Sequence, residues 1–167
     1  MKISMILDTS GSMAELAKPK ILQGILDFYQ QYELNFEKKI ELTYYKWNAE
    51  GILSITAQQT KQLEYCAKNN LESVIEYVDQ HQEDKIVLIS DGCFLETEIH
   101  LIQSALKKNK LNFFRVICIG TDDKRRLYHS KFGKSHVFDV EDISQVIPSL
   151  IFKKTLDITD LMTLIPS

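Results

Sequence analysis

The chain has 167 residues, of which 44% are hydrophobic and 26% are charged, a balance typical of one soluble globular domain. Its formal net charge of −3 excludes the strong basic bias of a nucleic-acid-binding domain. No run reaches the roughly 18 apolar residues that cross a bilayer, so we expect no membrane partner. The three cysteines lack C-x-x-C spacing, and no hydrophobic signal segment precedes the first strand, which predicts reduced thiols in the cytoplasm.

Short apolar runs, typical of buried strands, alternate with segments in which apolar residues recur at helical spacing. In chain order we expect a strand at 3–7, a helix at about 13–32, strands at 39–45 and 52–56, helices at about 60–67 and 71–81, a strand at 85–90, a helix at 96–108, a strand at 113–119, a helix near 124–131, a strand at 135–138 and a helix at about 141–153. Pro19 falls inside the first helix, which implies a position in the first turn or a kink.

This alternation predicts an α/β fold with an open, doubly wound, mostly parallel sheet and helices on both faces. The hairpin made by residues 39–45 and 52–56 adds one antiparallel edge strand. We assign residues 1–154 to this single domain and residues 155–167, which are apolar for a terminus, to a tail. The tail either docks on its own domain or contacts another chain.

Polar side chains stand where two of the predicted strands end. Asp8, Ser10 and Ser12 occupy alternate positions after the first strand, and Asp91 follows the strand at 85–90. Carboxyl ends of parallel strands meet at one edge of the sheet, where open α/β folds place their ligands. Two carboxylates and two hydroxyls suit a hard divalent cation, Mg²⁺ or Mn²⁺, which prefers oxygen ligands and keeps several waters.

The charge balance of such a site indicates binding rather than catalysis. If the hydroxyls bind directly and the carboxylates act partly through water, the cation keeps positive charge that its protein ligands do not neutralise. The cation then favours an acidic sixth ligand from another molecule. We therefore expect metal-dependent binding of a protein partner that presents Asp or Glu.

The Asp8-x-Ser10-x-Ser12 spacing resembles the metal-ion-dependent adhesion site (MIDAS) of von Willebrand factor A (vWA) domains. The resemblance extends over about residues 2–152. Three further segments carry it: an edge hairpin at 40–49, a fourth strand with its metal-site aspartate at 86–92 (IVLISDG), and a closing segment at 114–120 (FRVICIG). The resemblance to small, stand-alone, intracellular bacterial members implies a vWA (Rossmann-like) fold and a Mg²⁺-centred protein-binding site.

One loop departs from the family pattern. The family's metal-site threonine lies in a Gly-Gly-Thr-Asn-Leu-like loop, and the matching stretch here is Ala-Lys-Asn-Asn-Leu at 67–71. The resemblance therefore puts Asn69 at the threonine position, and an Asn carbonyl ligates Mg²⁺ with a longer reach. Thr60 stays open as another ligand, as does a site with no ligand from this loop.

Other hypotheses start from the same residues. A phosphatase with Asp8 as nucleophile needs a second acid two residues later, where Ser10 stands, and the chain lacks the Gly-x-Ser-x-Gly of serine hydrolases. The motif also suits a turn that only caps the next helix. By analogy with stand-alone bacterial vWA proteins, the resemblance implies an adaptor in a multi-protein assembly, for instance with an ATPase, kinase or protease, rather than an enzyme. A metal-dependent hydrolase that uses Asp8, and a metal-free scaffold that binds through the edge hairpin or the tail, remain alternatives.

Overall fold

One six-stranded sheet organises the chain. The computed structural model describes residues 1–35, 40–66, 68–81, 84–92, 94, 96–108, 113–120 and 136–151. Within these residues the strands are β1 (Lys2–Asp8), β2 (Glu41–Asn48), β3 (Gly51–Ile55), β4 (Lys85–Ser90), β5 (Phe114–Cys118) and β6 (Val137–Asp139), in the order β3-β2-β1-β4-β5-β6. Only the β2–β3 pair is antiparallel among these strands, which confirms the predicted mostly parallel sheet with an antiparallel edge.

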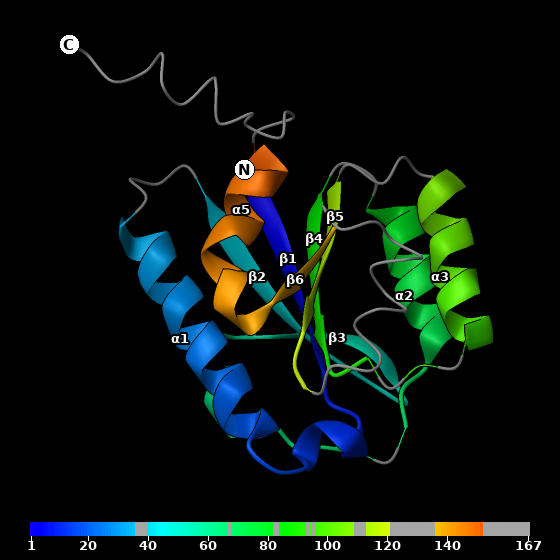
Figure 1. Cartoon of the computed structure of the whole chain (residues 1–167), viewed down its shortest axis with the longest axis horizontal. Coiled ribbons are helices and arrows are strands. Elements are labelled where there is room, and N and C mark those ends of the chain that lie inside the picture. Colours follow the sequence, from blue (N-terminus) through cyan, green and yellow to red (C-terminus); the bar gives the residue numbers. More distant parts are fainter. Residues whose placement is uncertain are drawn as a thin grey trace.

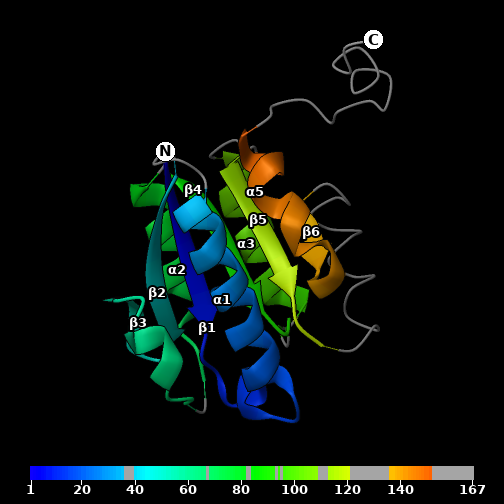
Figure 2. The same ribbon diagram turned by 90° about the vertical axis from the view of Figure 1, so that its left-hand side faces the viewer.

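Helices cover both faces of the sheet, as predicted. The α-helices of the described chain are α1 (Lys18–Asn35), α2 (Leu71–Gln80), α3 (Glu96–Lys108) and α5 (Ile143–Ile151), and three short 3₁₀ turns are η1 (Gly11–Ala14), η2 (Gln59–Gln62) and η4 (Val140–Asp142). Helices α1 and α5 lie on one face and α2 and α3 on the other (Figures 1 and 2). None of the helices in the described ranges is long and apolar enough to cross a membrane.

Strand β1 lies in the middle of the sheet and is buried on both faces. Successive side chains of a strand point to opposite faces. Ile3, Met5 and Leu7 therefore pack in the core beneath α1 and α5, whereas Ile6 packs in the core beneath α2 and α3. Each fully buried aliphatic side chain contributes roughly 1.5–3 kcal/mol. This two-sided burial explains the unbroken apolar run of the sequence.

The sheet order fixes where a ligand crevice lies. From β1 the chain passes through α1 to β2 on one side, and it returns through α2 to β4 on the other side. The strand order therefore reverses between β1 and β4, and open α/β sheets bind ligands outside the carboxyl ends of strands at such a point. In Figure 1 these ends lie at the lower edge of the sheet, beside η1 and the start of α1.

The first helix begins later than predicted, and the predicted helix at 60–67 is wrong. Helix α1 starts at Lys18, so Pro19 lies in its first turn, where a missing N–H removes no intrahelical hydrogen bond. Of the described residues 60–66, only those in η2 are helical, and Cys66 instead pairs with Ser10 in a parallel β-bridge. The Cys66 N–H donates to the Thr9 carbonyl at 2.8 Å, a tertiary contact that overrides the local helical pattern. The predicted helix near 124–131 and the tail at 155–167 lie outside the described residues.

Candidate metal site

A cavity of about 390 Å³ lies at the carboxyl ends of β1 and β4. The five residues predicted from the sequence all line it: Asp8, Ser10, Ser12, Asn69 and Asp91. The remaining walls come from Trp47, Lys68, Leu71, Phe94 and Glu98. The structure therefore brings together oxygen-bearing side chains from three segments that are far apart in the sequence.

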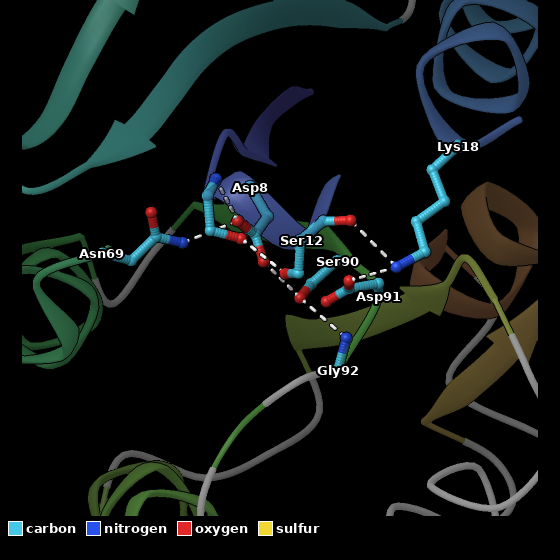
Figure 3. A network of polar contacts seen from close by, with 8 residues as sticks. Asp8, Ser12, Lys18, Asn69, Ser90, Asp91 and Gly92 are labelled. Atoms are coloured by element: carbon cyan, nitrogen blue, oxygen red, sulfur yellow. Dashed lines mark hydrogen bonds and ion pairs between the residues drawn. The ribbon is translucent and has the colours of Figure 1, made fainter. Parts of the chain in front are cut away.

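Asp8 ends β1 and is 1% exposed. Its Oδ1 accepts hydrogen bonds from the Ser10 backbone N–H at 2.8 Å and from the Asn69 amide nitrogen at 2.6 Å. Its Oδ2 accepts one from the Ser90 hydroxyl at 2.5 Å (Figure 3). Hydrogen bonds to a charged acceptor are short and strong, so these donors hold the Asp8 carboxylate in a single orientation.

The loop after β1 places the two serine hydroxyls side by side. Ser10 Oγ and Ser12 Oγ lie 3.1 Å apart. Ser10 precedes η1 in extended conformation, and its side chain makes no capping hydrogen bond within the described chain, so helix capping does not explain it. Thr9 anchors the loop to β2, because both its N–H and its hydroxyl donate to the Trp47 carbonyl, at 3.0 and 2.8 Å.

Two hydrogen bonds to β2 fix the loop that carries Asn69. The Asn70 N–H donates to the Asn48 carbonyl at 3.0 Å, and the Trp47 indole N–H donates to the Asn70 carbonyl at 2.7 Å. The Asn69 amide nitrogen faces Asp8, while its Oδ1 is buried and has no hydrogen-bond partner among the described residues. An unpaired buried polar atom costs about 1–3 kcal/mol, and such atoms often mark functional positions.

Asp91 follows β4, and its side chain is 2% exposed. The Lys18 ammonium, at the first residue of α1, donates to Asp91 Oδ2 at 2.7 Å and to the Ser12 carbonyl at 2.9 Å. The Ser90 hydroxyl accepts the Gly92 N–H at 3.0 Å, which orients the turn after β4. Gly92 has a φ of 72°, a left-handed conformation that glycine adopts without steric cost.

Sequence reasoning missed Lys18 and Ser90. Ser90 stands directly before Asp91 at a predicted strand end, which was a usable signal. Lys18 directly precedes Pro19, and placing that proline in the first turn puts the start of the helix at this edge of the sheet. Nothing in the local sequence pairs Lys18 with Asp91.

Thr60, the alternative ligand, lies elsewhere. It is buried in η2, where its hydroxyl donates to the Ala57 carbonyl at 2.7 Å and accepts from the Gln30 amide at 3.3 Å. It does not line the cavity at Asp8. In the described part of the chain no three His, Cys, Asp or Glu side chains cluster as a metal site. The predicted donors at the cavity are instead two carboxylates, two hydroxyls and an amide, and Glu98 adds a third carboxylate to the cavity wall.

Comparisons with known proteins identify the fold. Neither a family model nor a curated protein sequence matches the chain. The SpRpn10 VWA domain superposes with a TM-score of 0.61 at 12% identity, covering 89% of this chain and 95% of that one. Manganese-loaded Plasmodium vivax TRAP protein gives 0.60 at 12% identity, covering 90% and 73%. Proximal thread matrix protein 1 from the mussel byssus gives 0.58 at 12% identity, and the 90% of this chain that aligns spans only 44% of the mussel protein.

This chain therefore has a vWA-like fold: a mostly parallel six-stranded sheet between two layers of helices. The fold that the Asp8-x-Ser10-x-Ser12 resemblance implied is confirmed.

Proposed function

We propose that this chain is a protein-interaction module that binds an acidic residue of a partner protein through a divalent cation, Mg²⁺ or Mn²⁺. One observation carries the proposal: Asn69, whose Oδ1 is buried without a hydrogen-bond partner among the described residues, lines the same cavity as two hydroxyls and two buried carboxylates. These atoms are hard oxygen donors, which fit Mg²⁺ or Mn²⁺ and fit softer metals poorly.

Each residue has a distinct role in the proposed site. Ser10 and Ser12 supply hydroxyl oxygens directly, and Asp8 and Asp91 supply carboxylates directly or through water. Asn69 now presents its amide nitrogen to Asp8, so it offers its Oδ1 to the cation by turning the amide over. A bound cation supplies the positive charge that a partner carboxylate recognises.

The walls of the cavity provide the contacts for the rest of a partner. Leu71 and Phe94 offer apolar surface, and exposed Lys68 adds a positive charge that attracts an acidic segment, while Glu98 adds a negative charge to the same walls. The Plasmodium vivax TRAP structure of the same fold is manganese-loaded, which supports the choice of Mn²⁺ as a probe. We extend the proposal, on the analogy of the fold alone, to an adaptor in a cytoplasmic multi-protein assembly.

Calorimetric titration with MnCl₂ and MgCl₂ tests the metal site. We expect the wild-type chain to bind one cation saturably and to release it to EDTA. The Ser10→Ala/Ser12→Ala double variant loses this binding, because both direct hydroxyl ligands are gone. Ser104→Ala is the matched control, since this exposed hydroxyl donates only locally to the His100 carbonyl, at 2.8 Å. The absence of chelator-sensitive binding in the wild-type chain rules the proposal out.

The acidic partner is tested separately with peptides. Paired peptides that differ only by Asp against Asn are immobilised and exposed to the chain with Mn²⁺ or with EDTA. We expect binding only to the Asp peptides and only with Mn²⁺. Equal binding in EDTA favours a metal-free scaffold instead.

A further inference from the structure

A lysine ammonium lies between two parts of the proposed metal site. Lys18 Nζ is 2.7 Å from Asp91 Oδ2 and 2.9 Å from the carbonyl oxygen of Ser12 (Figure 3). The Lys18 side chain is 15% exposed and that of Asp91 is 2% exposed, so this ion pair is largely shielded from water. Gly120, beyond β5, lies against it: a Cβ there would be 3.6 Å from Lys18 Cε and 3.9 Å from Asp91 Cβ.

The Lys18 ammonium and a divalent cation bound in this cavity would compete for the same carboxylate. A lysine head is a compact point charge on a flexible stem, so it compensates Asp91 without a fixed bidentate geometry. Two cations within a few ångströms of one buried carboxylate repel each other strongly, because the surroundings screen them poorly. Direct ligation of a metal by Asp91 Oδ2 is therefore incompatible with Lys18 in its present position, because its ammonium occupies that oxygen.

We propose that Lys18 is an internal cation of this site, which holds Asp91 in the metal-free chain and must swing out before a divalent cation binds. The inference rests on the proposed function, because it concerns the same site. Lys18 lowers the metal affinity of the chain and stabilises the empty site. When the metal binds, the chain loses the stabilisation that the Lys18–Asp91 ion pair provides, and metal ligation replaces it.

The first experiment compares Mn²⁺ affinity by calorimetry in the wild-type chain, Lys18→Met and Lys20→Met. Lys20 is the matched control, because it lies in the same helix, carries the same charge and is exposed. We expect Lys18→Met to bind Mn²⁺ at least about tenfold more tightly than wild type, and Lys20→Met to match wild type. Unchanged or weaker binding in Lys18→Met refutes the competition. An equal gain in both variants also refutes it, since general charge then explains the effect.

A second experiment needs no variant, in case Lys18→Met fails to fold. The wild-type chain is treated with an amine-acetylating reagent in EDTA or in saturating Mn²⁺, and the modification of Lys18 relative to Lys20 is measured by peptide mass spectrometry. We expect the Lys18-to-Lys20 ratio to rise several-fold in Mn²⁺, because the metal releases the ammonium from Asp91. An unchanged ratio in chain that has bound Mn²⁺ contradicts the proposal.

The two experiments separate the inference from the function beneath it. If the wild-type chain binds Mn²⁺ but the Lys18 readouts do not move, only the internal-cation role fails. If the wild-type chain does not bind Mn²⁺, the metal-dependent function fails, and the competition fails with it.

Discussion

The two buried carboxylates of the candidate site are held in different ways. Asp8 is surrounded by neutral donors, namely a backbone N–H, the Asn69 amide and the Ser90 hydroxyl. Asp91 is instead bound by the charged head of Lys18. The backbone N–H and the Ser90 hydroxyl hold Asp8 in place whether or not the Asn69 amide turns over, whereas a long flexible side chain is a replaceable partner of Asp91. The site thus combines one carboxylate that has fixed partners with one that has an exchangeable partner, at the ends of neighbouring strands.

The largest expected effect comes from Asp8→Ala. The change leaves three donors without their acceptor in a buried site, and we expect the free energy of unfolding to fall by roughly 4 kcal/mol. Urea denaturation in EDTA measures it. Asp27→Ala is the control, because Asp27 is exposed and accepts a hydrogen bond from Gln23 on the helix surface. If the free energy of unfolding falls less in Asp8→Ala than in Asp27→Ala, the donors around Asp8 do not hold it in place.

Lys18→Met tests the exchangeable partner of Asp91 and has the second-largest expected effect. Lys18→Met removes the ammonium that pairs with the buried Asp91 side chain, and breaking such a pair costs about 3 kcal/mol in EDTA. Thermal denaturation with and without Mn²⁺ shows whether the metal restores the loss. If Lys18→Met is as stable as Lys20→Met in EDTA, the contrast between the two carboxylates disappears.

Ser90→Ala sharpens the comparison further, with an expected loss of about 2 kcal/mol. The Ser90 hydroxyl donates to Asp8 and accepts from Gly92, so its removal acts on the fixed partners of Asp8. In double-mutant cycles we expect strong coupling of Ser90→Ala with Asp8→Ala and near-additivity with Lys18→Met. Equal coupling of Ser90→Ala to Asp8→Ala and to Lys18→Met shows that the partners of Asp8 and of Asp91 form one network.

Leu16→Gly has the smallest expected effect and the opposite sign. Leu16 lies in the turn before Lys18, with a φ of 54° and 91% of its surface exposed. A left-handed conformation costs a leucine about 1–2 kcal/mol, so glycine stabilises the chain by roughly 0.5–1 kcal/mol. Leu34→Gly is the control: this exposed residue of α1 is helical, so the change destabilises the chain by about 1 kcal/mol. A loss at Leu16 equal to that at Leu34 shows that the turn is unstrained.

Most of the sheet could be predicted from the sequence, because its signals are local. In each of the strands β1, β2, β3 and β4, the pattern of apolar residues along the sequence follows the burial of that strand. The segment before α2 could not be predicted from the sequence, since its conformation depends on the contact of Cys66 with Thr9, 57 residues earlier in the chain. Helical spacing in that segment carries no information about such a partner.

The candidate site shows the same division. Strand ends meet at one edge of a parallel sheet, so the approach of Asp8 to Asp91 follows from the predicted topology. The orientation of the Asn69 amide and the pairing of Lys18 with Asp91, 73 residues apart, depend on side-chain conformations that no sequence pattern specifies. The metal itself stays a prediction.

Trp47 gives the cavity an optical probe of its own. It is the single tryptophan of the chain, and its fully buried indole lines the cavity with its ring centroid 5.6 Å from that of Phe94. Its N–H donates to the Asn70 carbonyl, next to Asn69, so a movement of that loop changes the surroundings of the indole. When it is excited at wavelengths that tyrosine does not absorb, the unlabelled chain therefore fluoresces only from one wall of the site, and we expect this emission to report ligand binding there without any attached dye.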